Sequence, residues 1–76
     1  MTVLPAELCR IGEALFGNAW RAPLADALGV NRRTLARWST GKFTPPEGIR
    51  GDLRRLCQGR ALLLLQQINE LIEEKP

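Results

Sequence analysis

Two arginines of one predicted helix, Arg33 and Arg37, have the chemistry and the spacing to read the edge of a base pair. They are four residues apart, so a helix places them one turn apart on the same side. A guanidinium donates two parallel hydrogen bonds and can bridge O6 and N7 of a guanine in the major groove of DNA. The alternative interpretation is a solvated helix face that contacts phosphates only. Base reading requires this helix to pack on one side and to expose its arginines on the other.

The residues around these arginines fit that requirement. At about 100° per residue, Leu35 and Trp38 fall on one side of the predicted helix, while Ala36 and Thr40 fall on the opposite side with the two arginines. Asn31 precedes the helix, and its side-chain oxygen is suited to accept from the first free N–H groups. Burial of Leu35 and Trp38 is expected to stabilise the fold by about 1.5–3 kcal/mol for each side chain.

The segment before this helix must position it, and its pattern predicts a second short helix. Leu24, Ala25 and Leu28 recur at helical spacing, and the three-residue junction 29–31 allows only a tight corner before the next helix. Such a corner favours positive φ, which glycine adopts without strain, so we expect positive φ at Gly29. Residues 21–40 therefore predict a helix-turn-helix, the arrangement that places its second helix in the major groove.

This part of the chain resembles the phage Cro and lambda-repressor family over about residues 15–45. The resemblance is carried by LADALGV at 24–30, Asn31, RRTLARW at 32–38, and Gly41-Lys42 followed by Pro45. Two departures are Arg21, where the family more often has glutamine, and Pro23. The resemblance implies a compact bundle of about five helices. It also implies a set of DNA-contacting residues: Arg21, Asn31, Arg32, Arg33, Arg37, Thr40 and Lys42. Among these, Arg21 and Lys42 would contact the phosphate backbone.

Apolar residues recur at helical spacing along the whole chain, without the alternation typical of strands. We predict one all-α domain over residues 1–76, with helices over about 5–16, from 20 or 21 to 28, 32–40, 46–57 and 60–74. Gly17 is expected to end the first helix, and Gly59 to break the chain between the last two.

The charge distribution favours a polyanionic partner. The chain has a formal net charge of +3, but residues 21–60 contain nine basic and three acidic side chains. Arg50, Arg54 and Arg55 form a second basic group, which either reaches flanking phosphates or is simply solvated. Histidine is absent, so the usual metal ligand and general base are missing, and Cys9 and Cys57 are expected to be reduced. We therefore expect no enzyme, no metal site and no cofactor.

The predicted helix over residues 60–74 is rich in leucine. Its apolar residues share a stripe about 120° wide, but Leu62 and Leu63 fall outside that stripe. We expect this helix to pack on the core and to form a homodimer, which would place two recognition helices about 34 Å apart on DNA; the alternative is a monomer. The leucine run is too short to cross a bilayer, and no secretory signal is present, so we expect a cytoplasmic protein without a membrane partner.

These observations predict a sequence-specific, double-stranded DNA-binding transcriptional regulator of the Cro/repressor type. No small-molecule ligand is expected, because 76 residues leave no room for an effector domain. One alternative is a helical protein-interaction module, such as an adaptor or antitoxin-like subunit that uses the leucine-rich helix. Another is the DNA-targeting module of a transposase or recombinase.

Overall fold

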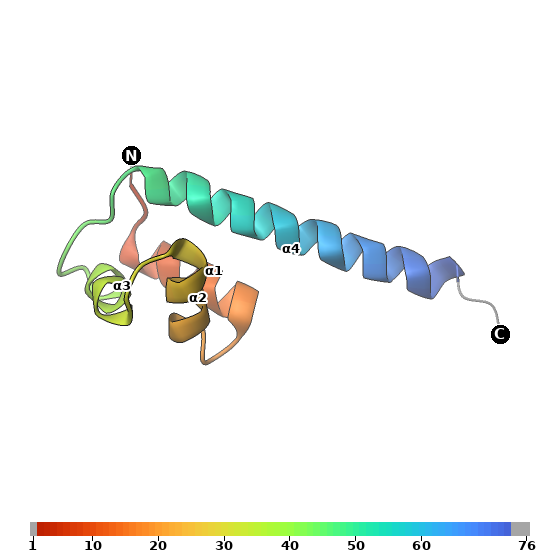
Figure 1. Cartoon of the computed structure of the whole chain (residues 1–76), viewed down its shortest axis with the longest axis horizontal. Helices are drawn as coiled ribbons and strands as arrows, with labels where there is room; N and C mark the ends of the chain where they lie inside the picture. Colours follow the sequence, from red (N-terminus) through yellow and green to blue (C-terminus); the bar gives the residue numbers. More distant parts are fainter. Residues whose placement is uncertain (1, 74–76) are drawn as a thin grey trace.

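A computed structural model describes residues 2–73 of the chain. Helices make up the regular structure of this part, and it contains no strand. They are α1 (Pro5–Phe16), α2 (Arg21–Leu28), α3 (Arg32–Ser39) and α4 (Gly48–Glu73). The first three are short and lie together, while α4 runs along them and continues far beyond them (Figure 1). The prediction of an all-α protein is confirmed.

The ends of the short helices follow the local sequence. Pro5 occupies the first turn of α1, where its missing N–H removes no intrahelical hydrogen bond. Gly17, with φ 80°, follows the last residue of α1, as predicted. Gly29 has φ 73° and ψ 28°, and its N–H donates to the carbonyls of the last turn of α2. The expected left-handed corner between α2 and α3 is therefore present at Gly29.

One apolar core joins the four helices. α3 packs against α1 and α2, whereas α4 contacts α1 and α2 but, among the described residues, not α3. The core thus separates α3 from α4. Its buried apolar residues are Val3, Leu8, Leu15, Trp20, Leu24, Ala25, Leu35, Trp38, Ile49 and Leu53.

A close approach between α1 and the start of α2 depends on a glycine. Gly12 is buried, and a Cβ built on it would lie 2.2 Å from Cε3 of Trp20. Trp20 is only 2% exposed, so its ring is held on all sides. The indole therefore lies directly on the backbone of α1, which fixes the distance at which α2 begins.

The prediction of two helices after residue 45 is wrong, because a single helix, α4, spans Gly48–Glu73. Gly59 lies inside it and is not among the glycines with positive φ, which are Gly17, Gly29 and Gly41. An interior glycine destabilises a helix by about 1 kcal/mol relative to alanine, which is too little to end one that favourable residues continue on both sides. Arg60 also donates to the carbonyl of Leu15 at 2.7 Å, and this hydrogen bond fixes the helix to α1 directly after the glycine.

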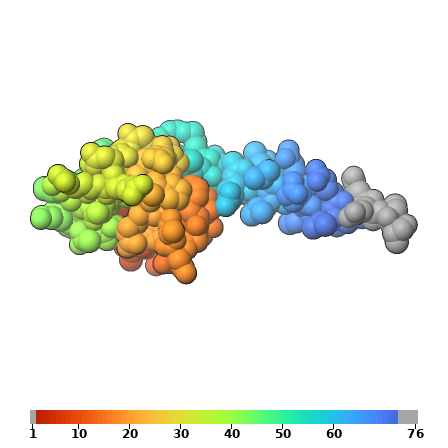
Figure 2. All heavy atoms as spheres, turned by 60° about the horizontal axis from the view of Figure 1, so that its bottom comes forward, coloured from red at the N-terminus to blue at the C-terminus, as the bar shows by residue number. Residues whose placement is uncertain are grey.

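The prediction that the leucine-rich end packs on the core is wrong. That role belongs to the beginning of α4, where Ile49 and Leu53 are buried and Leu56 is partly buried. Beyond Arg60, the apolar residues are exposed, and the molecule measures 53 × 24 × 20 Å. Figure 2 shows this part of α4 as a rod that leaves the rounded body. The predicted compact bundle of five helices is therefore wrong. The molecule instead has a small body, formed by α1, α2, α3 and the beginning of α4, from which the rest of α4 projects.

Cys9 and Cys57 are free thiols in the structure. Over residues 2–73, no helix has both the length and the apolar character needed to cross a membrane.

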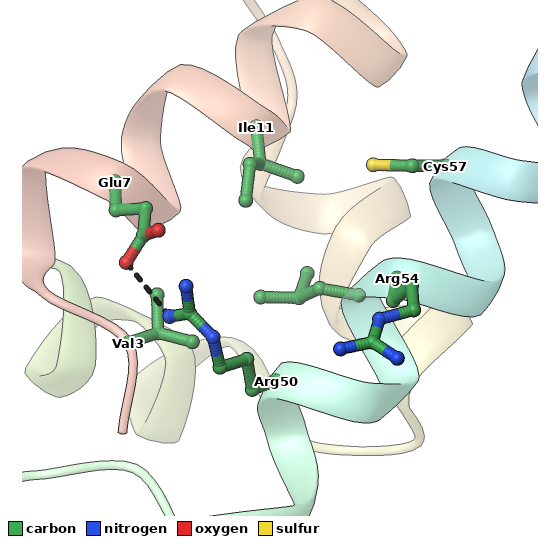
Figure 3. A pocket seen from close by; sticks show the side chains of 7 residues that line it. Val3, Glu7, Ile11, Arg50, Arg54 and Cys57 are labelled. Carbon is green, nitrogen blue, oxygen red and sulfur yellow. Dashed lines mark hydrogen bonds and ion pairs between the residues drawn. The ribbon is translucent and has the colours of Figure 1, made fainter. Parts of the chain in front are cut away.

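An ion pair connects α1 to α4 at the rim of a groove of about 180 Å³. Arg50 Nη1 donates to Glu7 Oε1 at 3.1 Å, as the dashed line in Figure 3 marks. This hydrogen bond, together with a weaker one from the backbone N–H of Leu4 at 3.3 Å, holds the pKa of Glu7 below its ordinary value of 4.5. The carboxylate form of Glu7 is therefore favoured by folding.

The sign of this shift predicts a pH dependence. A carboxyl whose pKa is lowered by folding adds stability above its ordinary pKa, and that contribution disappears as the pH falls through the lower folded value. We expect Glu7→Gln to unfold more easily than the wild type at neutral pH. In acid, well below pH 4.5, the two proteins should be equally stable. Urea unfolding over a pH series measures this difference, and a difference that is unchanged in acid would contradict the assignment.

Candidate nucleic-acid interface

The structure places all seven predicted DNA-contacting residues on the surface. They come from the start of α2, from α3 with its cap, and from the turn after α3. Each is exposed: Arg21, Asn31, Arg32, Arg33, Arg37, Thr40 and Lys42. On the opposite side of α3, Leu35 and Trp38 are 0% and 6% exposed. The predicted division of α3 into an apolar inner side and a basic outer side is therefore present.

The arginines of α3 form no ion pair within the described part of the chain. The ion pairs among the described residues lie elsewhere, between Arg50 and Glu7 and between Arg55 and Asp52. No acidic residue occurs in α3 itself, and its exposed Ala36 lies between arginines on the outer side. A small side chain at this position lets the backbone of α3 come close to a flat or grooved partner.

Arg37 is held in place by the aromatic ring of Phe43. Its Cζ lies 5.3 Å from the centroid of Phe43, which is 52% exposed. The backbone N–H groups of Lys42 and Phe43 both donate to the carbonyl of Arg37, at 2.9 and 3.2 Å. The turn thus folds back on the end of α3 and brings the ring to the guanidinium. A cation–π contact of this kind restricts the rotamers of Arg37 before any partner binds.

A second guanidinium group lies where α2 begins. Arg21 is positioned over the ring of Trp20, with its Cζ 4.7 Å from the ring centroid. Arg21 and Arg32 border a depression of about 370 Å³, which is otherwise lined by alanines: Ala19, Ala22 and Ala36. Two cations beside a shallow, uncrowded surface suit a phosphate group, since guanidinium groups bind phosphate oxygens through charged hydrogen bonds.

Asn31 caps α3, as predicted. Its Oδ1 accepts from the N–H of Thr34 at 2.7 Å, and its backbone is extended, with φ −83° and ψ 162°. This hydrogen bond leaves the amide nitrogen of Asn31 free to donate to a partner. Thr40 differs, because its hydroxyl donates to the carbonyl of Ala36 or Arg37, at 3.1 and 3.3 Å. Thr40 can therefore only accept from a partner while these bonds are kept.

The cap predicts a measurable stability effect. We expect Asn31→Ala to destabilise the protein by about 1 kcal/mol, because the Thr34 N–H loses its acceptor while the side chain stays exposed. Asn31→Ser is the matched control, since a serine oxygen accepts the same hydrogen bond. Thermal unfolding of both variants measures the effect, and equal losses in the two would contradict the capping role.

The second basic group lies on α4, where its members have other neighbours. Arg50 and Arg55 are engaged in ion pairs, and Arg54 borders the groove between α1 and α4. These arginines lie on a helix that does not contact α3.

Sequence reasoning missed Phe43, although its position gave a signal. An aromatic residue in a polar loop immediately after a cationic helix has no core to enter, and so it is available to stack on an arginine.

The described part of the chain contains no cluster of acidic residues and cysteines that could hold a metal ion. Comparisons with protein-family models, with curated proteins and with solved structures found no match.

Proposed function

We propose that this protein is a sequence-specific, double-stranded DNA-binding transcriptional regulator of the Cro/repressor type. In this proposal, α2 and α3 form a helix-turn-helix, and α3 enters the major groove. The observation that carries it is the division of α3, whose Leu35 and Trp38 are buried while Arg33 and Arg37 are exposed and free of acidic partners. A helix anchored in this way presents guanidinium groups to a groove without disturbing the core.

The proposed contacts fall into two classes. Arg33 and Arg37 read bases, because they lie one turn apart on the outer side of α3 and a guanidinium can bridge O6 and N7 of guanine. Arg21, Arg32 and Lys42 bind phosphates on the two sides of α3 and fix its register on the duplex. The depression between Arg21 and Arg32 supports this division, since it offers two cations to one phosphate.

The corner between the helices supports the same proposal. Gly29 takes the left-handed conformation, the N–H of Val30 donates to the carbonyl of Ala25 at 3.0 Å, and Asn31 starts the next helix. Three residues thus turn the chain between two eight-residue helices that share one core. A rigid connection is important for recognition of the base sequence, because a small rotation of α3 would move its guanidinium groups away from the bases.

The regulator acts as a homodimer in this proposal, and the exposed end of α4 joins the two copies. Two recognition helices then meet two half-sites of an inverted repeat. By occupying such a site, the dimer would block or recruit RNA polymerase. No enzymatic step, cofactor or small ligand is proposed for this action.

The dependence of DNA binding on salt tests the proposal. Each phosphate contact releases counterions, so removing one phosphate-binding cation should reduce the slope of log affinity against log salt by about 1. We expect this change for Lys42→Ala. Arg54→Ala is the matched control, because it removes one exposed positive charge on α4, away from α3. Fluorescence anisotropy with a labelled duplex at several salt concentrations gives both slopes. Equal slopes for the two variants, or no binding by the wild type, would contradict the proposal.

A protein-interaction module is the second candidate, favoured by the exposed apolar residues of α4. Leu62 and Leu63 are 62% and 48% exposed, so the apolar surface extends beyond a single stripe. An adaptor would bind a protein through these residues and would show no salt-dependent DNA binding. The same anisotropy experiment therefore separates the two functions.

A further inference from the structure

The projecting part of α4 has an apolar stripe that its own body leaves uncovered. The large residues of the stripe are 50–73% exposed. Figure 1 shows that this part of α4 has no neighbouring helix. Monomeric proteins rarely expose contiguous apolar patches larger than a few hundred Å². The stripe consists of Ala61, Leu64, Leu65, Ile68, Leu71 and Ile72.

We propose that a second copy of this chain covers the stripe, with the two α4 helices antiparallel. Ala61 then packs against the partner's Leu71, and Leu64 packs against the partner's Ile68. This inference deepens the dimer of the proposed function and does not depend on DNA binding.

The stripe lies beyond its own body and to one side of the body-facing side of α4, so its own body leaves it exposed. The body-facing side of α4 is defined by Ile49, Leu53 and Leu56. At about 100° per residue, that side continues through Arg60 and Gln67. The stripe is centred about a quarter of a turn to one side of this line. A straight helix cannot bring the stripe onto its own body.

The spacing of the stripe matches a helix-pairing seam. Ala61, Leu64, Ile68 and Leu71 are separated by three, four and three residues, which is the alternation of a and d positions in a coiled coil. Leu65 and Ile72 widen the seam on one side. In the proposed register, the seam residues Ala61, Leu64, Ile68 and Leu71 all meet seam residues of the partner, so the two seams overlap completely between Ala61 and Leu71.

Charge determines the orientation of the two helices. Residues 48–60 of α4 contain four arginines and one aspartate, whereas residues 61–73 contain two glutamates and no basic residue. In the proposed register, antiparallel pairing keeps the basic residues 48–60 of the two copies at opposite ends of the paired segment, and it also opposes the two helix dipoles. Parallel pairing would place like charges side by side. The antiparallel dimer is therefore favoured.

Cysteine cross-linking tests this arrangement. The native thiols are first removed by Cys9→Ala and Cys57→Ser, and single cysteines are then introduced by Ala61→Cys, Leu71→Cys or Gln66→Cys. We expect a mixture of the Ala61→Cys and Leu71→Cys proteins to form a mixed disulfide dimer under mild oxidation. Gln66 lies opposite the stripe, so a mixture of Ala61→Cys and Gln66→Cys is the matched control and should form few mixed dimers. Circular dichroism verifies that each variant keeps its helix content.

Each other outcome overturns the inference. A disulfide between two copies of the Leu71→Cys protein, in preference to the mixed dimer, would indicate parallel helices. Equal cross-linking of the Gln66→Cys control would indicate random collision. No mixed dimer, with a monomer in sedimentation equilibrium, would exclude the dimer. Anisotropy on the same samples distinguishes this failure from a loss of DNA binding, because one helix-turn-helix can still contact a half-site.

Discussion

The double variant Arg33→Ala/Arg37→Ala is expected to lose at least about 30-fold in affinity for a specific site and almost all preference between DNA sequences. Each arginine that reads a base contributes about 1–3 kcal/mol, concentrated at one base position. Both side chains are exposed on the outer side of α3 and neither belongs to the buried core, so the fold should be retained. Anisotropy with a selected duplex and with an unrelated duplex of equal length measures the affinity and the preference.

A double variant on other helices provides the control. Arg10→Ala/Arg54→Ala removes the same charge from exposed positions on α1 and α4. We expect it to weaken binding to the two duplexes about equally and to keep the ratio between them. If both double variants reduced this ratio to the same extent, α3 would not be the element that reads sequence.

The second large effect concerns stability. We expect Gly12→Ala to destabilise the protein by about 3 kcal/mol or more, at the upper end of the range for overpacked cores. The new Cβ would lie 2.2 Å from Cε3 of Trp20, and that ring is part of the buried core. For a domain of this size, such a loss corresponds to a fall of more than about 10 °C in the melting temperature.

Gly59→Ala is the matched control for this prediction. A Cβ at Gly59 meets no atom within 4 Å, and the residue lies inside α4. Alanine should therefore stabilise the protein by up to about 1 kcal/mol. Urea unfolding of the two variants measures effects of opposite sign. Unfolding of Gly12→Ala at the wild-type urea concentration would show that α1 and Trp20 are not packed as described.

The positions of α2 and α3 could be predicted from the sequence because their signals are local. The apolar spacing of Leu24 and Leu35, the glycine at the corner and the asparagine at the cap each act within a few residues. The structure has Gly29 in the left-handed region and Asn31 bonded to the Thr34 N–H. The exposure of the arginines on α3 followed from the same helical geometry.

The length and direction of α4 could not be predicted in the same way. Whether Gly59 ends a helix depends on whether a turn at this position would bring the following residues into more favourable contacts. Those contacts are a property of the tertiary structure. Arg60 reaches the carbonyl of Leu15, 45 residues earlier in the sequence. This contact favours continuation of the helix, and no pattern within a short window could indicate it.

The neighbours of individual side chains were also hidden. The contact between Arg37 and Phe43 depends on a turn that folds back on α3, and the close approach of Trp20 to Gly12 depends on the crossing of two helices. Helical periodicity could predict neither contact, because it assigns residues to the sides of a helix but does not identify the residues that they contact.

Selection from a randomised pool of duplex DNA, followed by sequencing of the bound fragments, tests the central claim most directly. The anchored basic helix predicts strong enrichment of a short motif containing guanines, and the proposed dimer predicts that the motif is arranged as an inverted repeat. The Arg33→Ala/Arg37→Ala protein should enrich no motif from the same pool. A wild-type protein that recovers fragments without any preferred sequence, or recovers none, would contradict the assignment of α3 as a recognition helix.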